Sequence, residues 1–299
     1  MALFAALCIY LFQKLSLLGW HNLIAAAPSN PWFYATLLAA YLVLPSFEAL
    51  IYGRIWRVRL WRDFPVFMRK KVLNEAVLGY SGEAYLYFWA RHALRLPDSE
   101  IFAAIRDNNL ISATVSTGLA IILAGAVCLS GELDVILRGD ATLARRMTIA
   151  LMASALVLLL VLVLRRRFSA LPPSLSRWLF MANGSRLLMT ETLQLVQWSI
   201  ALPFVPAWTW LALLAGQTLL TRVPFLPNKE LTVLAFGVTL AGVLSTSGVQ
   251  LSGMLMAAAA ASQGLNALAF VATSLGWRRP SATDRPTSAP SRVEPAGGG

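Results

Sequence analysis

Two short stretches of this sequence combine ionisable side chains with residues that interrupt helices. One runs from Tyr80 to Glu83 and contains Gly82, and the other runs from Arg222 to Glu230 and contains two prolines. A helix that begins near Ser81 places Glu83 in its first turn, where the helix dipole stabilises a carboxylate. Glu83 is then either an ordinary helix-start acid or a carboxylate that pairs with a cation inside a cavity.

A cation follows Glu83 on a similar helical face, because Arg91 lies about two turns further along the chain. Asn74 precedes the same break and adds a neutral polar group to it. The candidate substrate-binding residues of both stretches are Asn74, Tyr80, Ser81, Glu83, Arg91, Arg222, Lys229 and Glu230.

The second stretch has two interpretations. In one it is a cytoplasmic loop in which proline stops a helix, Asn228 caps the next helix and Glu230 occupies the first turn. In the other it is a second broken helix that faces the first one. Interrupted segments at corresponding places of two halves of a chain are typical of a transport site.

Other polar residues indicate different chemistry. Asp107 or Glu83 has the side chain that a general base needs in a membrane-embedded transferase, although Asp107 is also expected to cap a helix together with Asn109. His21 and His92 are isolated, with no metal-ligand spacing, and no nucleotide-binding motif occurs, so no cofactor is expected.

Two further features fall inside apolar segments. Glu48 lies about one and a half turns from the end of its segment, where it can reach the interface or pair with an arginine. Glu191, Gln194 and Gln197 recur at every third position and form a polar stripe, which is typical of helix-to-helix contacts.

The elements that must position these residues follow from composition. Of the 299 residues 58% are hydrophobic and only 13% are charged, about half the charge of a soluble domain. The apolar residues form long runs, which predict an all-α protein that crosses a membrane several times. The net charge of +11 sits in short loops between these runs, so it indicates topology and not nucleic-acid binding.

The runs define a set of candidate spans. They are Ala2–Leu18, Trp32–Gly53, Asn109–Leu129, Met147–Leu164, Leu188–Phe204, the short Ala207–Thr221, Leu231–Gly248 and Ser252–Leu275. Lys71–Arg95 is too polar for a span and predicts a pair of helices broken near Gly79–Gly82 that enters the membrane without crossing it. The architecture expected is about eight spans with one or two re-entrant elements.

Basic residues set the orientation, since they cluster after the second, fourth and last spans. Their alternation predicts that both termini are cytoplasmic. Residues 1–276 are expected to form the membrane domain, and residues 277–299, rich in proline and small polar residues, a disordered cytoplasmic tail.

Several of these pieces occur in an order that resembles a known family. They are Gly19-Trp20, the basic aromatic run Tyr52–Leu60, the break at Gly82-Glu83, Asp107, and the proline-bearing stretch that ends in Glu230. Over roughly residues 1–276 the chain resembles the flippase-like membrane domain of lysylphosphatidylglycerol synthases and of stand-alone bacterial proteins, without the aminoacyl transferase domain.

The resemblance implies two re-entrant elements that meet in a charged cavity. It also implies movement of a lipid or lipid-linked precursor across a bacterial inner membrane, with membrane lipids as the partners. A membrane transferase and a non-catalytic assembly protein remain the alternatives. Transport is favoured over catalysis.

Overall fold

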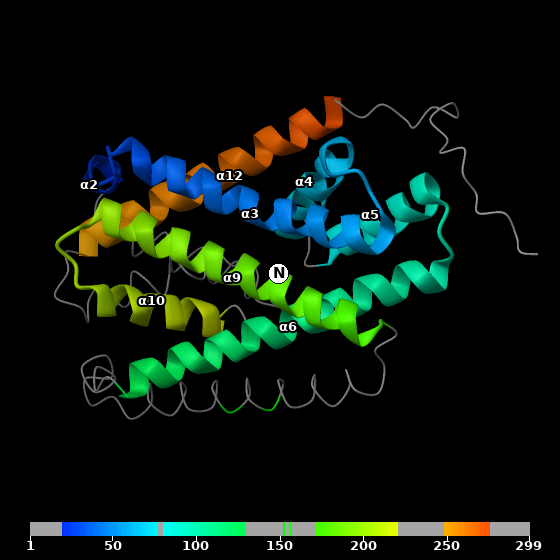
Figure 1. The fold of residues 1–299 in the computed structure, drawn as a ribbon. Helices are drawn as coiled ribbons and strands as arrows, with labels where there is room; N and C mark the ends of the chain where they lie inside the picture. Colours follow the sequence, from blue (N-terminus) through cyan, green and yellow to red (C-terminus); the bar gives the residue numbers. More distant parts are fainter. Residues whose placement is uncertain are drawn as a thin grey trace, which may run out of the picture.

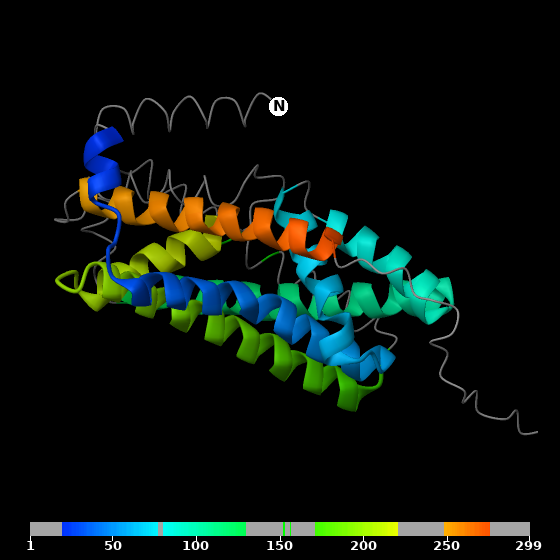
Figure 2. The same cartoon turned by 90° about the horizontal axis from the view of Figure 1, so that it is seen from above.

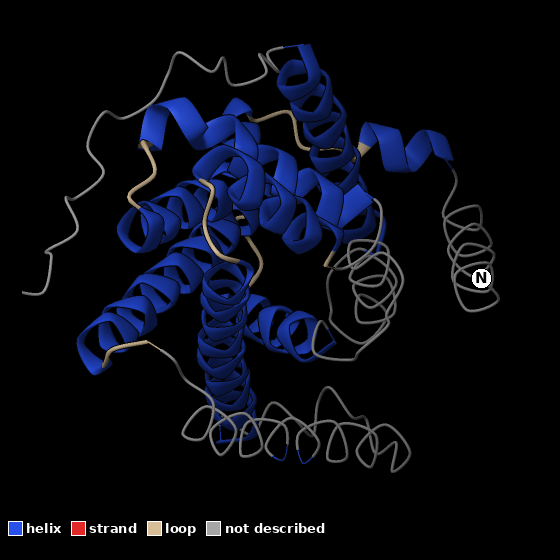
Figure 3. Cartoon of the chain, turned by 90° about the vertical axis from the view of Figure 1, so that its right-hand side faces the viewer, coloured by secondary structure: helices blue, strands red, loops and turns tan. Residues whose placement is uncertain are grey.

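The described part of the chain is helical. The computed structural model describes residues 20–76, 80–129, 152, 156, 171–220 and 248–275, and within them no strand occurs (Figure 3). The helices are α2 (Trp20–Ala25), α3 (Pro31–Trp56), α4 (Leu60–Ala76), α5 (Ser81–Trp89), a π-helical turn (Ala90–Leu94), α6 (Asp98–Leu129), α9 (Pro173–Ala201), α10 (Ala207–Leu220) and α12 (Gly248–Leu275). The prediction of an all-α architecture is confirmed for these residues.

Three of the described helices are long and apolar enough to cross a membrane: Pro31–Trp56, Asp98–Ala126 and Val249–Ser274. Large apolar side chains also face outward from them, including Trp32, Ile122 and Leu268, each more than 60% exposed. Exposed apolar side chains in such number suit a protein whose surroundings are lipid. The structure thus supports a membrane protein.

Other predicted features lie beyond this part of the chain. The predicted spans Ala2–Leu18, Met147–Leu164 and Leu231–Gly248 fall almost wholly outside the described residues, as does the predicted tail from residue 277.

The helix termini follow from local sequence. At the start of α3 the Asn30 side chain accepts a hydrogen bond from the Trp32 backbone N–H at 3.0 Å, and Pro31 occupies the first helical position. The helix ends where Arg57 adopts a left-handed conformation with φ 55°. Pro45 lies inside α3 and removes one backbone hydrogen bond there.

Two predicted boundaries need correction. α6 begins at Asp98, so Asp107 and Asn109 lie inside this helix and do not cap it. α9 begins at Pro173, well before the predicted start at Leu188. In both helices the first turns are polar, and a hydropathy window detects only the apolar remainder of such a helix.

The helices pack as a bundle around a central antiparallel pair. α3 runs along α9 in the opposite direction, α12 crosses on one side of this pair, and α6 and α10 lie on the other (Figures 1 and 2). α4 and α5 form a hairpin that contacts the second half of α3, and α4 also contacts α12.

Two apolar cores occupy opposite parts of the bundle. One surrounds Trp198 and Trp210, where α9 and α10 meet the start of α3 and α12. The other surrounds Tyr52, Phe67 and Leu86, where α4 and α5 meet the end of α3 together with α6 and α9. The candidate site lies beside the second core.

Candidate functional site

The break between α4 and α5 is closed by side chains of the hairpin itself. The Asn74 side-chain oxygen accepts a hydrogen bond from the Gly82 backbone N–H at 2.7 Å, and the Ser81 hydroxyl donates to the Leu73 carbonyl oxygen at 2.6 Å. Tyr80 has the left-handed φ of 75° that reverses the chain. The predicted helix start at Ser81 is confirmed, and Glu83 lies in the first turn of α5.

Gly82 permits α5 to approach α4 at backbone distance. A Cβ atom at this position would collide with the Lys70 carbonyl oxygen and lie 2.7 Å from the Asn74 side-chain oxygen. Only glycine fits a contact this close. This contact places Glu83 next to the middle of α4, within ion-pair distance of Lys70.

Three ionisable side chains meet beside this contact. The Lys70 ammonium forms ion pairs with Glu48 of α3 and with Glu83 of α5, the latter at 3.3 Å between Nζ and Oε1. Lys70 is 1% exposed and Glu48 is 6% exposed. Three helices therefore each contribute one charged group to a buried position.

Both carboxylates retain an oxygen without a partner. Glu48 Oε2 and Glu83 Oε2 are buried, and neither accepts a hydrogen bond from any described residue. The Tyr52 side chain is also fully buried close to these carboxylates. An unsatisfied buried carboxylate oxygen is costly, so these two oxygens are candidate contacts for a bound ligand.

The Lys70 ammonium stays charged in this setting. Glu48 and Glu83 both form ion pairs with the ammonium, and carboxylates this close favour its charged form. Lys70 is therefore positive at neutral pH and balances one of its two carboxylates.

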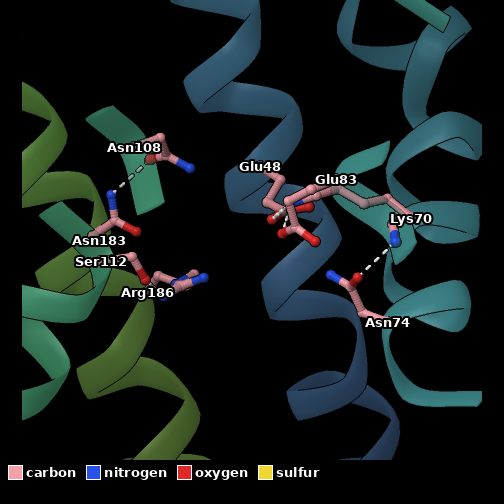
Figure 4. A network of polar contacts seen from close by, with 9 residues as sticks. Glu48, Lys70, Asn74, Glu83, Asn108, Ser112, Asn183 and Arg186 are labelled. Atoms are coloured by element: carbon pink, nitrogen blue, oxygen red, sulfur yellow. Dashed lines mark hydrogen bonds and ion pairs between the residues drawn. The ribbon is translucent and has the colours of Figure 1, made fainter. Parts of the chain in front are cut away.

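A fourth charge comes from α9. Arg186 donates from Nη2 to the Ser112 hydroxyl oxygen of α6 at 2.9 Å, and its guanidinium extends toward Glu48 and Glu83 (Figure 4). Next to it the Asn183 amide donates to the Asn108 side-chain oxygen at 3.1 Å. Among the described residues Arg186 makes no ion pair as close as those of Lys70. We call Glu48, Lys70, Glu83 and Arg186 the charged cluster.

Several of the residues predicted for the site lie elsewhere. Arg91 is in the π-helical turn, where it pairs with Asp98 at 3.3 Å with its side chain 53% exposed. Lys70 and not Arg91 is thus the cation beside Glu83. The Tyr80 side chain is 75% exposed, so it is not part of the buried charged cluster.

The second predicted element is not part of the described chain. Arg222, Lys229 and Glu230 lie outside the described residues, so their predicted approach to Glu83 stays a prediction. Asp107 is 2% exposed and lies 2.8 Å from Arg106 Nη2, which makes it one half of an ion pair inside α6.

Sequence reasoning missed Lys70 and Arg186. Lys70 stands in a run of basic residues that was interpreted as a topology signal, and Arg186 lies before the predicted start of its span. One signal was present, because Glu48 is an acid inside an apolar run and needs a cation nearby. Its partner is Lys70 from the next helix, whereas the two predicted alternatives were the membrane interface and an arginine.

The remaining chemistry is sparse. Within the described ranges no group of three or more His, Cys, Asp or Glu side chains is arranged to hold a metal ion. Within the polar stripe on α9, Gln194 makes the predicted helix-to-helix contact, since it exchanges two amide hydrogen bonds of 3.1 and 3.2 Å with Gln217 of α10.

Comparison with known proteins gives no relative from which a function can be transferred. No family model, no curated protein and no solved structure matches the chain.

Asn74→Ala tests the closure of the hairpin. This variant leaves the Gly82 N–H without its acceptor, so we expect the free energy of unfolding to fall by about 1–3 kcal/mol. Unfolding of the purified protein in mixed detergent micelles, followed by circular dichroism, measures the change. Asn109→Ala on α6 controls for loss of an asparagine side chain, and equal stability of the two variants would contradict the assignment.

Proposed function

We propose that this chain is a lipid transporter that moves a lipid or lipid-linked precursor between the leaflets of a bacterial inner membrane. The observation that carries the proposal is the charged cluster, which four helices build in the interior of an apolar bundle. Ionisable groups at membrane depth are costly and are usually found where a polar substrate or ion must pass.

The broken helix supports the same function. Helices that end inside a membrane protein expose backbone groups, which is tolerated where the break is buried in protein or faces a wet passage. Here α4 ends at Ala76 and α5 begins at Ser81, and the break brings Glu83 to Lys70. A polar headgroup can exchange contacts with such groups while its acyl chains stay in the bilayer.

We further propose the topology that fits the charge pattern. The chain has about eight spans with both termini in the cytoplasm, and α4 and α5 form a re-entrant hairpin that returns to its starting side. Arg57 and Arg59, between α3 and α4, and Arg62, in the first turn of α4, then face the cytoplasm. A re-entrant hairpin is also what the resemblance to the flippase-like membrane domain implies.

Reconstitution in vesicles tests the proposal. A phospholipid that carries its fluorophore on the acyl chain keeps its headgroup intact, and dithionite bleaches only the label in the outer leaflet. Vesicles with the full chain should bleach beyond the half expected for protein-free vesicles. Glu83→Gln should slow this movement about tenfold or more, because a charge-assisted contact contributes about 1.5–3 kcal/mol.

Glu75→Gln is the matched control, since Glu75 lies on α4, pairs with Lys71 and is not part of the charged cluster. It removes the same charge and should leave the rate unchanged. Bleaching equal to that of protein-free vesicles would reject transport of the lipids tested, and equal rates for Glu83→Gln and wild type would remove Glu83 from the mechanism.

A further inference from the structure

The charged cluster has two sides of opposite sign. On one side Arg186 lies with Ser112, and on the other Glu48 and Glu83 each present an unpaired oxygen, with Lys70 bound to both (Figure 4). A ligand between these sides meets a donor group at one end and an acceptor group at the other.

The charges of the cluster balance. Two carboxylates, Glu48 and Glu83, oppose two cations, Lys70 and Arg186, so the sum is zero. Lys70 compensates one carboxylate and leaves one negative charge beside it, which Arg186 balances from across the site. A bound ligand with a net charge would leave that charge uncompensated in an apolar bundle, which is strongly unfavourable.

The side formed by Arg186 and Ser112, which we call the donor side, has the chemistry of a phosphate site. The guanidinium is planar and presents several N–H groups in the geometry that fits two phosphate oxygens. Because Ser112 accepts the bond from Arg186 with its oxygen, its hydroxyl hydrogen remains for a second acceptor.

The side formed by Glu48 and Glu83, which we call the acceptor side, has the chemistry of an ammonium site. Glu48 Oε2 and Glu83 Oε2 are two buried acceptors without donors among the described residues. A primary ammonium supplies three N–H donors and one positive charge. It therefore has donors enough for both oxygens.

We propose that the charged cluster binds a zwitterionic headgroup that carries one phosphate diester and one primary ammonium. The phosphate binds Arg186 and Ser112, and the ammonium binds Glu48 and Glu83. This assignment names the substrate class of the proposed transporter, so it rests on the proposed function. Its test measures lipid binding and does not require transport.

The test compares two lipids that differ in headgroup charge. Phosphatidylethanolamine carries the phosphate and the ammonium, whereas phosphatidylglycerol carries only the phosphate. Native mass spectrometry of the purified full chain in detergent counts bound lipid at increasing concentration. We expect phosphatidylethanolamine to bind at least tenfold more tightly.

Two variants separate the sides of the site. Arg186→Gln should weaken phosphatidylethanolamine binding about tenfold, and Arg186→Lys, which keeps the charge but loses the planar guanidinium, should weaken it less. Glu83→Gln leaves the empty cluster one positive charge in excess, so its preference should shift to phosphatidylglycerol. This reversal is a gain of binding, which a misfolded variant cannot produce. Arg54→Gln and Glu75→Gln, outside the cluster, should behave like wild type.

Other outcomes would overturn the assignment. Equal or tighter binding of phosphatidylglycerol to the wild type rejects a zwitterionic site, as does an unchanged preference in both Arg186→Gln and Glu83→Gln. Binding of soluble glycerophosphoethanolamine that neither lipid displaces assigns the same chemistry to a soluble zwitterion. The expected binding pattern without lipid movement in vesicles would support the headgroup assignment and reject transport.

Discussion

Replacement of Lys70 with methionine is expected to lower the free energy of unfolding by about 3–5 kcal/mol, because removing one partner of a buried ion pair leaves the other charge uncompensated. Here a single ammonium serves two carboxylates, Glu48 and Glu83. Methionine has a similar length and fills the space, so the loss reports the charge and not a void.

The measurement is unfolding in mixed detergent micelles, with Lys71→Met as the control. Lys71 is the neighbouring buried lysine, but the side chain of its partner Glu75 is 35% exposed, so this variant should lose less. The double variant of Lys70→Met and Glu83→Gln retains Glu48 and Arg186, one charge of each sign. It should recover much of the stability, and failure of Lys70→Met to destabilise more than Lys71→Met would contradict the ion-pair assignment.

Gly82→Ala is expected to destabilise the protein by forcing α5 away from α4. The added methyl group meets the Lys70 carbonyl oxygen and the Asn74 side-chain oxygen. One of these atoms belongs to backbone in the middle of α4 and cannot turn away, so α5 must shift. Overpacking of this kind costs about 1–3 kcal/mol, and the shift moves Glu83 away from Lys70.

The control for Gly82→Ala is Gly118→Ala on α6, where an added Cβ meets no atom within 4 Å. There the exchange should be neutral or stabilise by up to about 1 kcal/mol, since alanine favours the helix. Opposite signs for the two variants in the same unfolding assay are the expected result. Equal effects would mean that α5 does not rest on α4 at this glycine.

Much of the local structure could be predicted from the sequence. The break between Ala76 and Ser81 and the place of Glu83 in the first turn of α5 followed from Gly82 and from helix-start chemistry. Such features depend on neighbouring residues, which a single sequence displays directly. The long apolar helix α3 was also predicted from the sequence, and its ends lie within a few residues of the predicted ones.

The partners of Glu83 could not be predicted in the same way. Lys70 precedes it on another helix, and Arg186 approaches from α9, more than a hundred residues away. Such pairs depend on how helices pack, and the spacing of residues along one helix gave Arg91 instead. The polar first half of α9 concealed Arg186 as well, because hydropathy detects a helix by its apolar part.

The balance of charge in the cluster has a consequence for its response to membrane voltage. An electric potential of 100 mV does about 2.3 kcal/mol of work on each elementary charge that crosses it. Glu48, Lys70, Glu83 and Arg186 together carry no net charge. A rearrangement that moves all four through the field, empty or with a neutral cargo, is therefore electrically silent, and the resting potential of a cell neither drives it nor opposes it.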